Sequence, residues 1–363
     1  MEGKTTLQRL HLDISLLIAL IILCGIGFVI LYSVGEQQSA LITRQLIHVI
    51  VAFLLLLVCA QISPTQLQRW SLWIYLFGII LLILVLYFGQ MSKGAQRWLD
   101  LSLFRFQPSE IMKLAVPMAI AWYFSENHLP PSLLRTIVAC GMIIVPVLLI
   151  GKQSDLGTAL LVAAAGLSVI FVAGVSWKLI TSFILLTTLS TPVLWHFMHD
   201  YQRRRVLTFL DPEQDPLGAG YHIIQSKIAI GSGGLYGKGW FNGTQSHLEF
   251  LPERLTDFIF SGFSEEFGFI GALFLLCIYT FVIARCLFIA VNAQYTFDRL
   301  LAFSLTLTFF VYIVVNMGMA TGQLPVVGVP LPLISYGGTS MVTLMIGFGI
   351  TMAINSHRRL LSA

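Results

Sequence analysis

Apolar and polar positions follow one another along this chain in long blocks, not in short periods. Ten apolar runs come close to the ~20 residues that a helix needs to cross a bilayer. No strand-like alternation of useful length accompanies them, so the pattern predicts an all-α polytopic membrane protein with a single domain over residues 1–363. The ten runs cover 14–34, 42–62, 70–90, 109–125, 136–151, 156–173, 178–198, 263–285, 300–321 and 333–354.

One long polar segment, residues 199–260, separates the seventh apolar run from the eighth. It contains seven of the 17 carboxylates of the chain and ends at Asp257, close to where the apolar pattern resumes. Aromatic and branched residues recur along it, which is untypical of disordered segments. Loops of this length inside compact proteins are usually functional. We therefore expect an ordered loop that bears a functional site.

Composition supports a membrane environment, because only 10% of the residues are charged, 57% are hydrophobic and the mean hydropathy is +0.85. The first run follows basic residues and lacks a small-residue cleavage site, so we expect an uncleaved signal anchor. Cytoplasmic segments of membrane proteins are enriched in Lys and Arg. This rule favours cytoplasmic termini and an extracytoplasmic position for residues 199–260. The inner segments would contain Lys4, Arg9, Arg69, Arg135, Lys178, Arg285, Arg299, Arg358 and Arg359, and the outer ones Arg44, Lys93, Arg97, Arg105 and Lys152.

Several other patterns exclude common kinds of site. The five cysteines form no CxxC pair, the glycine-rich stretch 231–239 lacks the Lys-Ser or Lys-Thr of a nucleotide loop, and no basic patch indicates nucleic acid. His48, His222 and His247 lack metal-ligand spacing, which favours structural roles. Residues 321–338 are apolar but contain three prolines and four glycines. This composition predicts a half-inserted irregular segment that lines a cavity.

Ionisable residues at the ends of the apolar runs are the candidates for chemistry. Glu110 and Lys113 are three residues apart and share a helix face, as a functional pair or as a pair that only neutralises itself. Asp155 is a functional residue or a helix N-cap, and both roles are compatible. Asp257 is a candidate general base, and its alternative is again a cap. The basic residues Arg97 and Arg105 suit an anionic head group such as a diphosphate.

Several ordered blocks resemble the signatures of the SEDS family. They are KGAQRW (93–98), FQPSE (106–110), QSDLGT (153–158), GSGGL (231–235), GKG (237–239), FLPERLTDF (250–258) and PLPLISYGG (330–338). The resemblance extends over nearly the whole chain. Within the family, the short N-terminal tail and residues 200–221 favour the elongation branch of a Gram-negative bacterium over the cell-division branch.

The resemblance implies an inverting peptidoglycan glycosyltransferase of the bacterial inner membrane. Such an enzyme polymerises lipid II into β-1,4-linked glycan on undecaprenyl diphosphate for cell elongation and rod shape. The essential aspartate of the family falls on Asp257, and its cavity residues fall on Glu110, Lys113 and Asp155. Lys113, Arg97 and Arg105 would stabilise the leaving diphosphate. The alternative is a divalent cation, Mg²⁺ or Mn²⁺, held by carboxylates, and no metal ligand is assigned.

The partners implied by the resemblance are a class B penicillin-binding protein, which crosslinks the glycan, and other membrane proteins of the elongation machinery. Two other functions remain open for a chain of this kind. It could transport lipid II across the membrane as a flippase, or serve only as a membrane scaffold for a penicillin-binding protein. Polymerisation by the purified protein distinguishes the enzyme from both.

Overall fold

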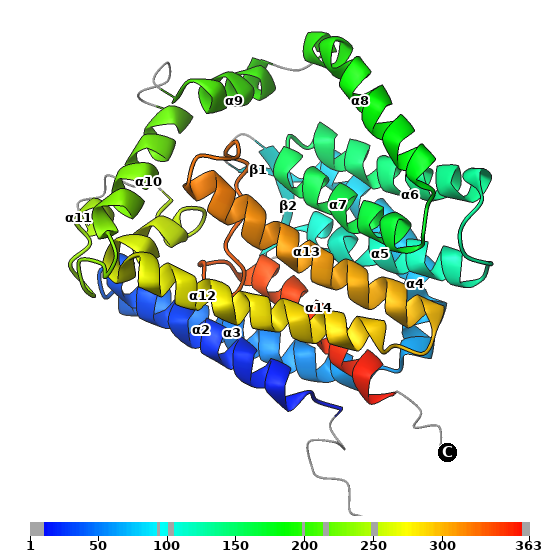
Figure 1. Cartoon of the computed structure of the whole chain (residues 1–363), viewed down its shortest axis with the longest axis horizontal. Coiled ribbons are helices and arrows are strands. Elements are labelled where there is room, and N and C mark those ends of the chain that lie inside the picture. The colour runs from blue at the N-terminus through cyan, green and yellow to red at the C-terminus, as the bar shows by residue number, and fades with distance from the viewer. Residues whose placement is uncertain are drawn as a thin grey trace, which may run out of the picture.

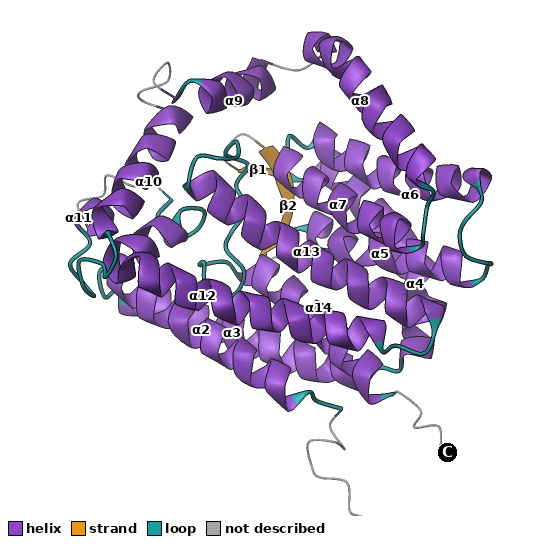
Figure 2. Ribbon diagram, viewed as in Figure 1, coloured by secondary structure: helices purple, strands orange, loops and turns teal. Residues whose placement is uncertain are grey.

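The computed structural model describes residues 11–92, 95–100, 105–197, 200–212, 218–247 and 253–357. Each of the ten predicted apolar ranges overlaps a helix in these residues, and Figure 2 shows that helices dominate the molecule. The helices are α2 (Ile14–Val34), α3 (Ser39–Gln61), α4 (Pro64–Phe88), α5 (Pro108–Ser125), α6 (Leu133–Lys152), α7 (Leu156–Val172), α8 (Trp177–Phe197), α9 (Asp200–Leu210), α10 (Ala219–Gly233), α11 (Thr244–His247), α12 (Ile259–Val291), α13 (Thr296–Ala320) and α14 (Gly338–Ser356).

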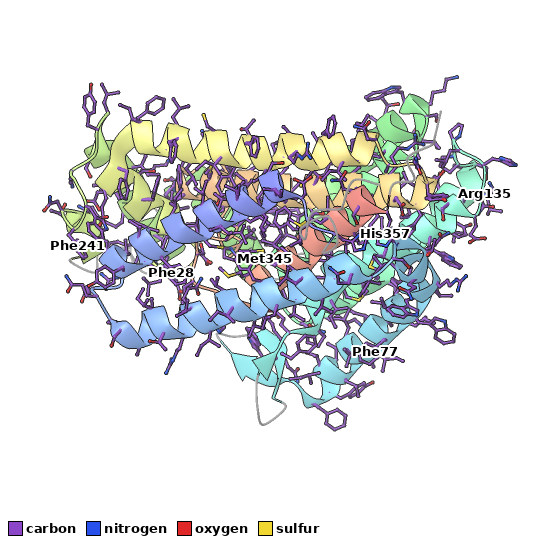
Figure 3. The ribbon with its side chains drawn as sticks, turned by 90° about the horizontal axis from the view of Figure 1, so that it is seen from below. Phe28, Phe77, Arg135, Phe241, Met345 and His357 are labelled. Carbon is purple, nitrogen blue, oxygen red and sulfur yellow. The ribbon has the colours of Figure 1, made fainter. Side chains whose placement is uncertain are left out.

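Within the described residues, seven helices are long and apolar enough to cross a membrane: α2, α3, α4, α6, α12, α13 and α14. The helix α7 is apolar but has only 17 residues. Large apolar side chains also cover the outside of the molecule: Trp73 is 72% exposed and Phe77 55%. Figure 3 shows Phe77 pointing away from α4, whereas Met345 is enclosed by helices. These features indicate a multi-pass membrane protein, and the count of ten spans stays a prediction.

The helix α13 lies at the centre of the packed bundle, between α12 on one side and α5 and α7 on the other (Figure 1). The helix α3 packs along α14, and α2 packs along α12. Figure 1 shows α8 and α9 along the upper edge, apart from this bundle. The central position of α13 matters for function because its polar side chains reach several neighbouring elements.

A small antiparallel sheet corrects the all-α expectation. Strands β1 (Gln90–Ser92), β2 (Ala95–Asp100) and β3 (Arg105–Phe106) follow α4 in the order β1–β2–β3. Gln90 pairs with Trp98, and Asp100 pairs with Arg105. These strands are too short to show a two-residue period in the sequence, so pattern analysis does not detect them. The sheet fixes the backbone of Arg97 beside the end of α6.

In its described residues, the polar segment 199–260 contains the helices α9, α10 and α11 and the first residues of α12. The helix α10 packs against α12 and α13. Ser226 on α10 anchors it, because its hydroxyl lies 2.5 Å from Ser261 Oγ and donates a 2.5 Å hydrogen bond to the carbonyl of Ala320. The helices α10 and α11 are therefore packed on the bundle, whereas α9 lies apart from it.

The segment between α13 and α14 is irregular, as its prolines and glycines predict. Gly322, Gly328 and Leu333 have positive φ angles of 72°, 76° and 63°. The apolar run predicted from residue 333 starts as a helix only at Gly338, because the preceding turn includes Leu333 in the left-handed region. Tyr279 of α12 anchors this turn by donating a 2.7 Å hydrogen bond to the carbonyl of Pro332.

Candidate active site

A cavity of about 970 Å³ brings together most of the residues singled out in the sequence. Small-molecule sites usually occupy roughly 300–1,000 Å³, so this volume is at the upper end of the range. Five of the six predicted site residues line it, contributed by the sheet, α5, the start of α7 and the segment before α12: Arg97, Glu110, Lys113, Asp155 and Asp257. The sixth residue, Arg105, belongs to β3, and its backbone pairs with Asp100 of β2. Its side chain lies outside the described part of the structure.

Glu110 and Lys113 form a buried pair on the first two turns of α5. Pro108 at the first helical position starts the helix there. Lys113 Nζ donates to Glu110 Oε1 at 2.7 Å and also to the hydroxyl of Tyr312 on α13. Glu110 is 6% exposed, and its second oxygen, Oε2, finds no hydrogen-bond partner among the described residues. The predicted pair is therefore present and lies at the wall of the cavity.

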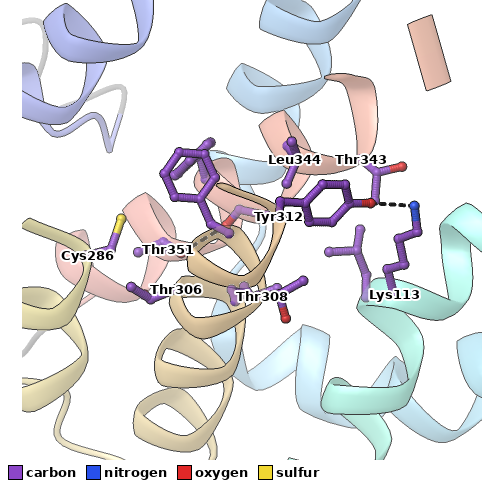
Figure 4. Close-up of a pocket in the computed structure, with 13 residues that line it drawn as sticks. Lys113, Cys286, Thr306, Thr308, Tyr312, Thr343, Leu344 and Thr351 are labelled. Carbon is purple, nitrogen blue, oxygen red and sulfur yellow. Dashed lines mark hydrogen bonds between the residues drawn. The ribbon is translucent and has the colours of Figure 1, made fainter. Parts of the chain in front are cut away.

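A second, small cavity of about 30 Å³ shares Lys113 and Tyr312 with the large one, and its lining residues are drawn in Figure 4. Its threonine hydroxyls do not compete for the lysine, because they bond carbonyls of their own helices. Thr308 donates to Ser304 O at 2.8 Å, and Thr351 donates to Gly347 O at 2.9 Å. Tyr312 and Glu110 therefore hold the ammonium group in place.

Asp155 caps a helix and also lines the cavity. It is the N-cap of α7, where its Oδ1 accepts a 3.2 Å hydrogen bond from the Thr158 amide. Its Oδ2 accepts a 3.0 Å hydrogen bond from Gln107 Nε2 and lies 3.6 Å from Arg97 Nε. Arg97 also donates to the carbonyl of Ser154 at 3.2 Å. Asp155 thus begins α7 and holds the guanidinium of Arg97 at the cavity.

Asp257 lines the same cavity two residues before α12 begins. Phe258, not Asp257, occupies the N-cap position of α12, and Thr256 directs its hydroxyl to Glu253 Oε2 at 2.9 Å. The capping alternative for Asp257 is therefore not supported. A Cβ atom added at Gly328 would lie 3.5 Å from Asp257 Oδ2, so the carboxylate lies close to the backbone of the irregular segment.

Other cavity residues were not singled out in the sequence. Tyr312 lines the cavity, and Asn316 lies one turn further along α13. Together with Thr308 they recur every four residues, which places three polar side chains on one face of an apolar helix. This spacing is the signal that could have identified them. His48, which we expected to be structural, also lines the cavity, and its ring lies 6.0 Å from that of Tyr336.

The described residues offer no assembled metal centre, since no three His, Cys, Asp or Glu side chains among them are grouped to hold an ion. The cavity carboxylates Glu110, Asp155 and Asp257 come from separate elements, and the first two are already paired with basic side chains. The basic side chains that line the cavity, Arg44, Arg97 and Lys113, are the groups available here to interact with an anionic ligand.

Comparisons with known proteins identify the family of this chain. Residues 6–360 match the family model of FtsW, RodA and SpoVE, described as cell cycle proteins. The chain is 52% identical over 360 residues to the peptidoglycan glycosyltransferase MrdB of Escherichia coli K12, covering 99% of this chain and 97% of that protein. Both the family match and the identity extend over nearly the full length.

Two solved structures share the fold. A chain from a study of how a peptidoglycan synthase complex coordinates polymerization and crosslinking has a TM-score of 0.83 and 32% identity, covering 94% of this chain and 97% of that one. The crystal structure of the rod shape determining protein RodA of Thermus thermophilus has a TM-score of 0.72 and 27% identity, with coverages of 94% and 96%. The chain therefore belongs to the FtsW, RodA and SpoVE family of cell cycle proteins, which is the SEDS family that its sequence blocks resemble.

Proposed function

We propose that this protein is a peptidoglycan glycosyltransferase that polymerises lipid II for cell elongation. The observation that carries the proposal is the single cavity lined by Asp257, Lys113 and Arg97. Glycosyl transfer from a diphosphate donor requires a base for the attacking hydroxyl and positive charge for the leaving group. The cavity provides the carboxylate of Asp257 for the first requirement and basic side chains, among them Lys113 and Arg97, for the second.

In the proposed reaction, the 4-hydroxyl oxygen of lipid II attacks the anomeric carbon of the growing glycan. The bond from this carbon to the diphosphate oxygen breaks, and the diphosphate leaves with the electron pair. The carboxylate of Asp257 accepts the proton of the hydroxyl. Attack from the face opposite the leaving group inverts the α-linked donor into a β-1,4 bond.

Lys113 and Arg97 interact with the leaving diphosphate, and their paired carboxylates hold them in position. Glu110 lies 2.7 Å from the lysine nitrogen, and Asp155 lies 3.6 Å from Arg97 Nε. Preorganised charges stabilise a developing anion without reorganisation during the reaction. We propose the same role for the side chain of Arg105. This residue directly precedes the FQPSE block (106–110), of which Gln107 and Glu110 line the cavity.

The proposed location is the bacterial inner membrane, with cytoplasmic termini and the cavity on the periplasmic side, as the distribution of basic residues favours. The proposed partners are a class B penicillin-binding protein and other membrane proteins of the elongation machinery. The similarity to a chain of a peptidoglycan synthase complex that polymerises and crosslinks supports a crosslinking partner.

The decisive experiment compares glycan synthesis from lipid II by purified wild-type protein with its transpeptidase partner and by Asp257→Asn. General acid–base catalysis contributes about 10²- to 10⁴-fold, so we expect a loss of at least 10²-fold with an unchanged unfolding temperature. Asp211→Asn is the matched control, because Asp211 is an exposed carboxylate of the same polar segment and does not line the cavity. Full polymerisation by Asp257→Asn would disprove the role of Asp257.

The same assay separates the enzyme from the two alternatives. A scaffold produces no glycan in any variant. A flippase moves lipid II across proteoliposome membranes, and Asp257→Asn would leave this transport unchanged while the wild-type protein produces no glycan.

A further inference from the structure

Three consecutive backbone carbonyls hold the segment that carries Asp257. The carbonyl of Leu255 accepts a 2.8 Å hydrogen bond from the Tyr336 amide. The carbonyl of Thr256 accepts a 2.5 Å hydrogen bond from the Ser335 hydroxyl. The carbonyl of Asp257 accepts a 2.8 Å hydrogen bond from Asn316 Nδ2 on α13. The general base of the proposed reaction is therefore fixed through its own peptide group by a side chain that takes no part in the chemistry.

The amide of Asn316 bridges two segments that line the cavity. Its Nδ2 donates to the carbonyl of Asp257 and also, at 2.7 Å, to the carbonyl of Val329 in the irregular segment. Both acceptors are carbonyl oxygens, so only the amide orientation that presents nitrogen to them is chemically sensible. Asn316 is fully buried, and its Oδ1 finds no hydrogen-bond partner among the described residues.

A buried asparagine in an apolar helix is costly unless its polar atoms are satisfied. Here one oxygen remains without a described partner while the nitrogen serves two carbonyls, so the residue is poorly suited to stability alone. The two hydrogen bonds of Asn316 fix the distance between the backbone of Asp257 and that of Val329, which lines the cavity. Gly328, the neighbour of Val329, lies close to the Asp257 carboxylate, because a Cβ atom added to it would be 3.5 Å from Asp257 Oδ2.

We propose that Asn316 is a positioning residue that sets the place of the Asp257 carboxylate in the cavity. This inference rests on the proposed glycosyltransferase function and on the role of Asp257 as base. Loss of the two hydrogen bonds frees the peptide of Asp257 from α13 and from Val329. A base displaced by about 1 Å can lower the rate about 10²-fold without changing how the substrate binds.

The test measures kcat and KM for lipid II with purified Asn316→Ala and Asn316→Asp in complex with the transpeptidase. The alanine removes the amide, whereas the aspartate keeps its size but presents only oxygen to the two carbonyls. We expect kcat to fall about 10- to 100-fold in both variants, with KM changed less than about threefold because Asn316 binds no substrate. An equal loss in both variants assigns the effect to hydrogen-bond donation and not to side-chain volume.

Ser304→Ala is the matched control on the same helix. Ser304 is fully buried and donates a 2.8 Å hydrogen bond to the carbonyl of Ala165 on α7, away from the Asp257 segment. We expect this variant to lower the unfolding temperature while keeping kcat. If the Asn316 variants lose no more kcat than Ser304→Ala at a comparable unfolding temperature, the proposal is wrong.

A parallel loss of lipid II affinity would also overturn the proposal, because it would indicate collapse of the cavity instead of displacement of the base. Failure of the underlying function has a different signature. In that case the wild-type protein itself makes no glycan, whereas failure of the positioning role leaves wild-type activity intact and the Asn316 variants equally active.

Discussion

At the scale of single residues, the buried pair of Glu110 and Lys113 is the most sensitive point of the cavity. Both side chains are almost completely buried, at 6% and 4% exposure. A buried ion pair adds little net stability, but removal of one partner leaves an uncompensated charge at a cost of about 3–5 kcal/mol. Single and double substitutions of this pair therefore have different consequences.

We predict that Lys113→Met lowers both stability and activity, because it leaves the Glu110 carboxylate buried without its cation. Adding Glu110→Gln should restore most of the unfolding temperature, since the buried negative charge disappears. It should not restore glycan synthesis, because the positive charge near the leaving diphosphate remains absent. Thermal unfolding in detergent and the lipid II assay measure the two effects. A double variant no more stable than Lys113→Met would show that the pair does not control stability.

Sequence reasoning identified Asp155, Asp257 and the Glu110–Lys113 pair because charges next to apolar runs are conspicuous and lie in recognisable blocks. It missed Tyr312 and Asn316, which are uncharged and isolated within an apolar run. Their importance arises from what other segments bring to them: Lys113 from α5, and the carbonyls of Asp257 and Val329 from two irregular stretches. Contacts between distant segments of this kind are not encoded in local spacing.

At the scale of elements, α12 is bent at Gly268, where φ is 65° and ψ is −165°. The stretch after α10 is hydrogen-bonded to this bend. The amides of Lys238 and Gly239 donate to the carbonyls of Glu265 and Glu266, each at 3.0 Å, and the Phe269 amide donates to Gly234 at 2.9 Å. The Lys238 ammonium also lies 2.7 Å from Glu265 Oε1. The polar segment is thereby attached to the helix that follows Asp257.

Gly237 is essential to this attachment, because its φ is +80° and a Cβ atom would come within 2.1 Å of the Glu266 carbonyl. We predict that Gly237→Ala destabilises the protein by about 2 kcal/mol or more, since strain in the left-handed region adds to the clash. Gly231→Ala is the control: Gly231 lies within α10 with open space around its Cβ position, so alanine should gain about 0.5–1 kcal/mol. Unfolding temperatures of both variants measure the difference. Equal effects would contradict the close approach.

The glycines of this stretch show how far the sequence predicts an element. Their spacing predicts turns, but Gly231 and Gly233 lie within α10, whereas Gly234, Gly237 and Gly239 have the positive φ angles typical of glycine turns. The spacing does not reveal that Gly233 and Gly237 are needed for contact with α12, where added Cβ atoms would lie 2.1 Å from the carbonyls of Ser264 and Glu266. The strands β1 to β3 escape prediction because they are too short to show a clear two-residue period.

At the scale of the whole molecule, the two ends of the described chain meet. The ring of His11 stacks on that of His357, with centroids 4.6 Å apart. Asp13, the N-cap of α2, accepts hydrogen bonds from Asn355 at 2.9 Å and from Arg285 at 2.6 Å. Both ends therefore lie at the same end of the bundle.

The Asp13 cluster joins the start of α2 to α12 and to the end of α14, so its charge should influence the stability of the whole bundle. Burial alone raises the pKa of Asp13, but hydrogen bonds from Arg285, the Leu16 amide and Ser15, with the charge of Arg285, lower it below the ordinary value of 3.8 overall. A carboxylate with a lowered pKa stabilises the folded state fully above its unfolded pKa. This contribution disappears as the pH falls through the folded value.

We therefore predict that Asp13→Asn lowers the unfolding temperature at pH 7, corresponding to about 1–3 kcal/mol for hydrogen bonds to a charged group. The difference from the wild-type protein should persist down to about pH 4 and shrink at lower pH, because the wild-type carboxylate then becomes protonated as well. Thermal unfolding from pH 7 to pH 3 measures this convergence. Asp211→Asn, at an exposed position, is the control and should show no pH-dependent difference of this size. If the gap for Asp13→Asn stays constant down to pH 3, the ionised carboxylate is not what holds the two ends of the chain together.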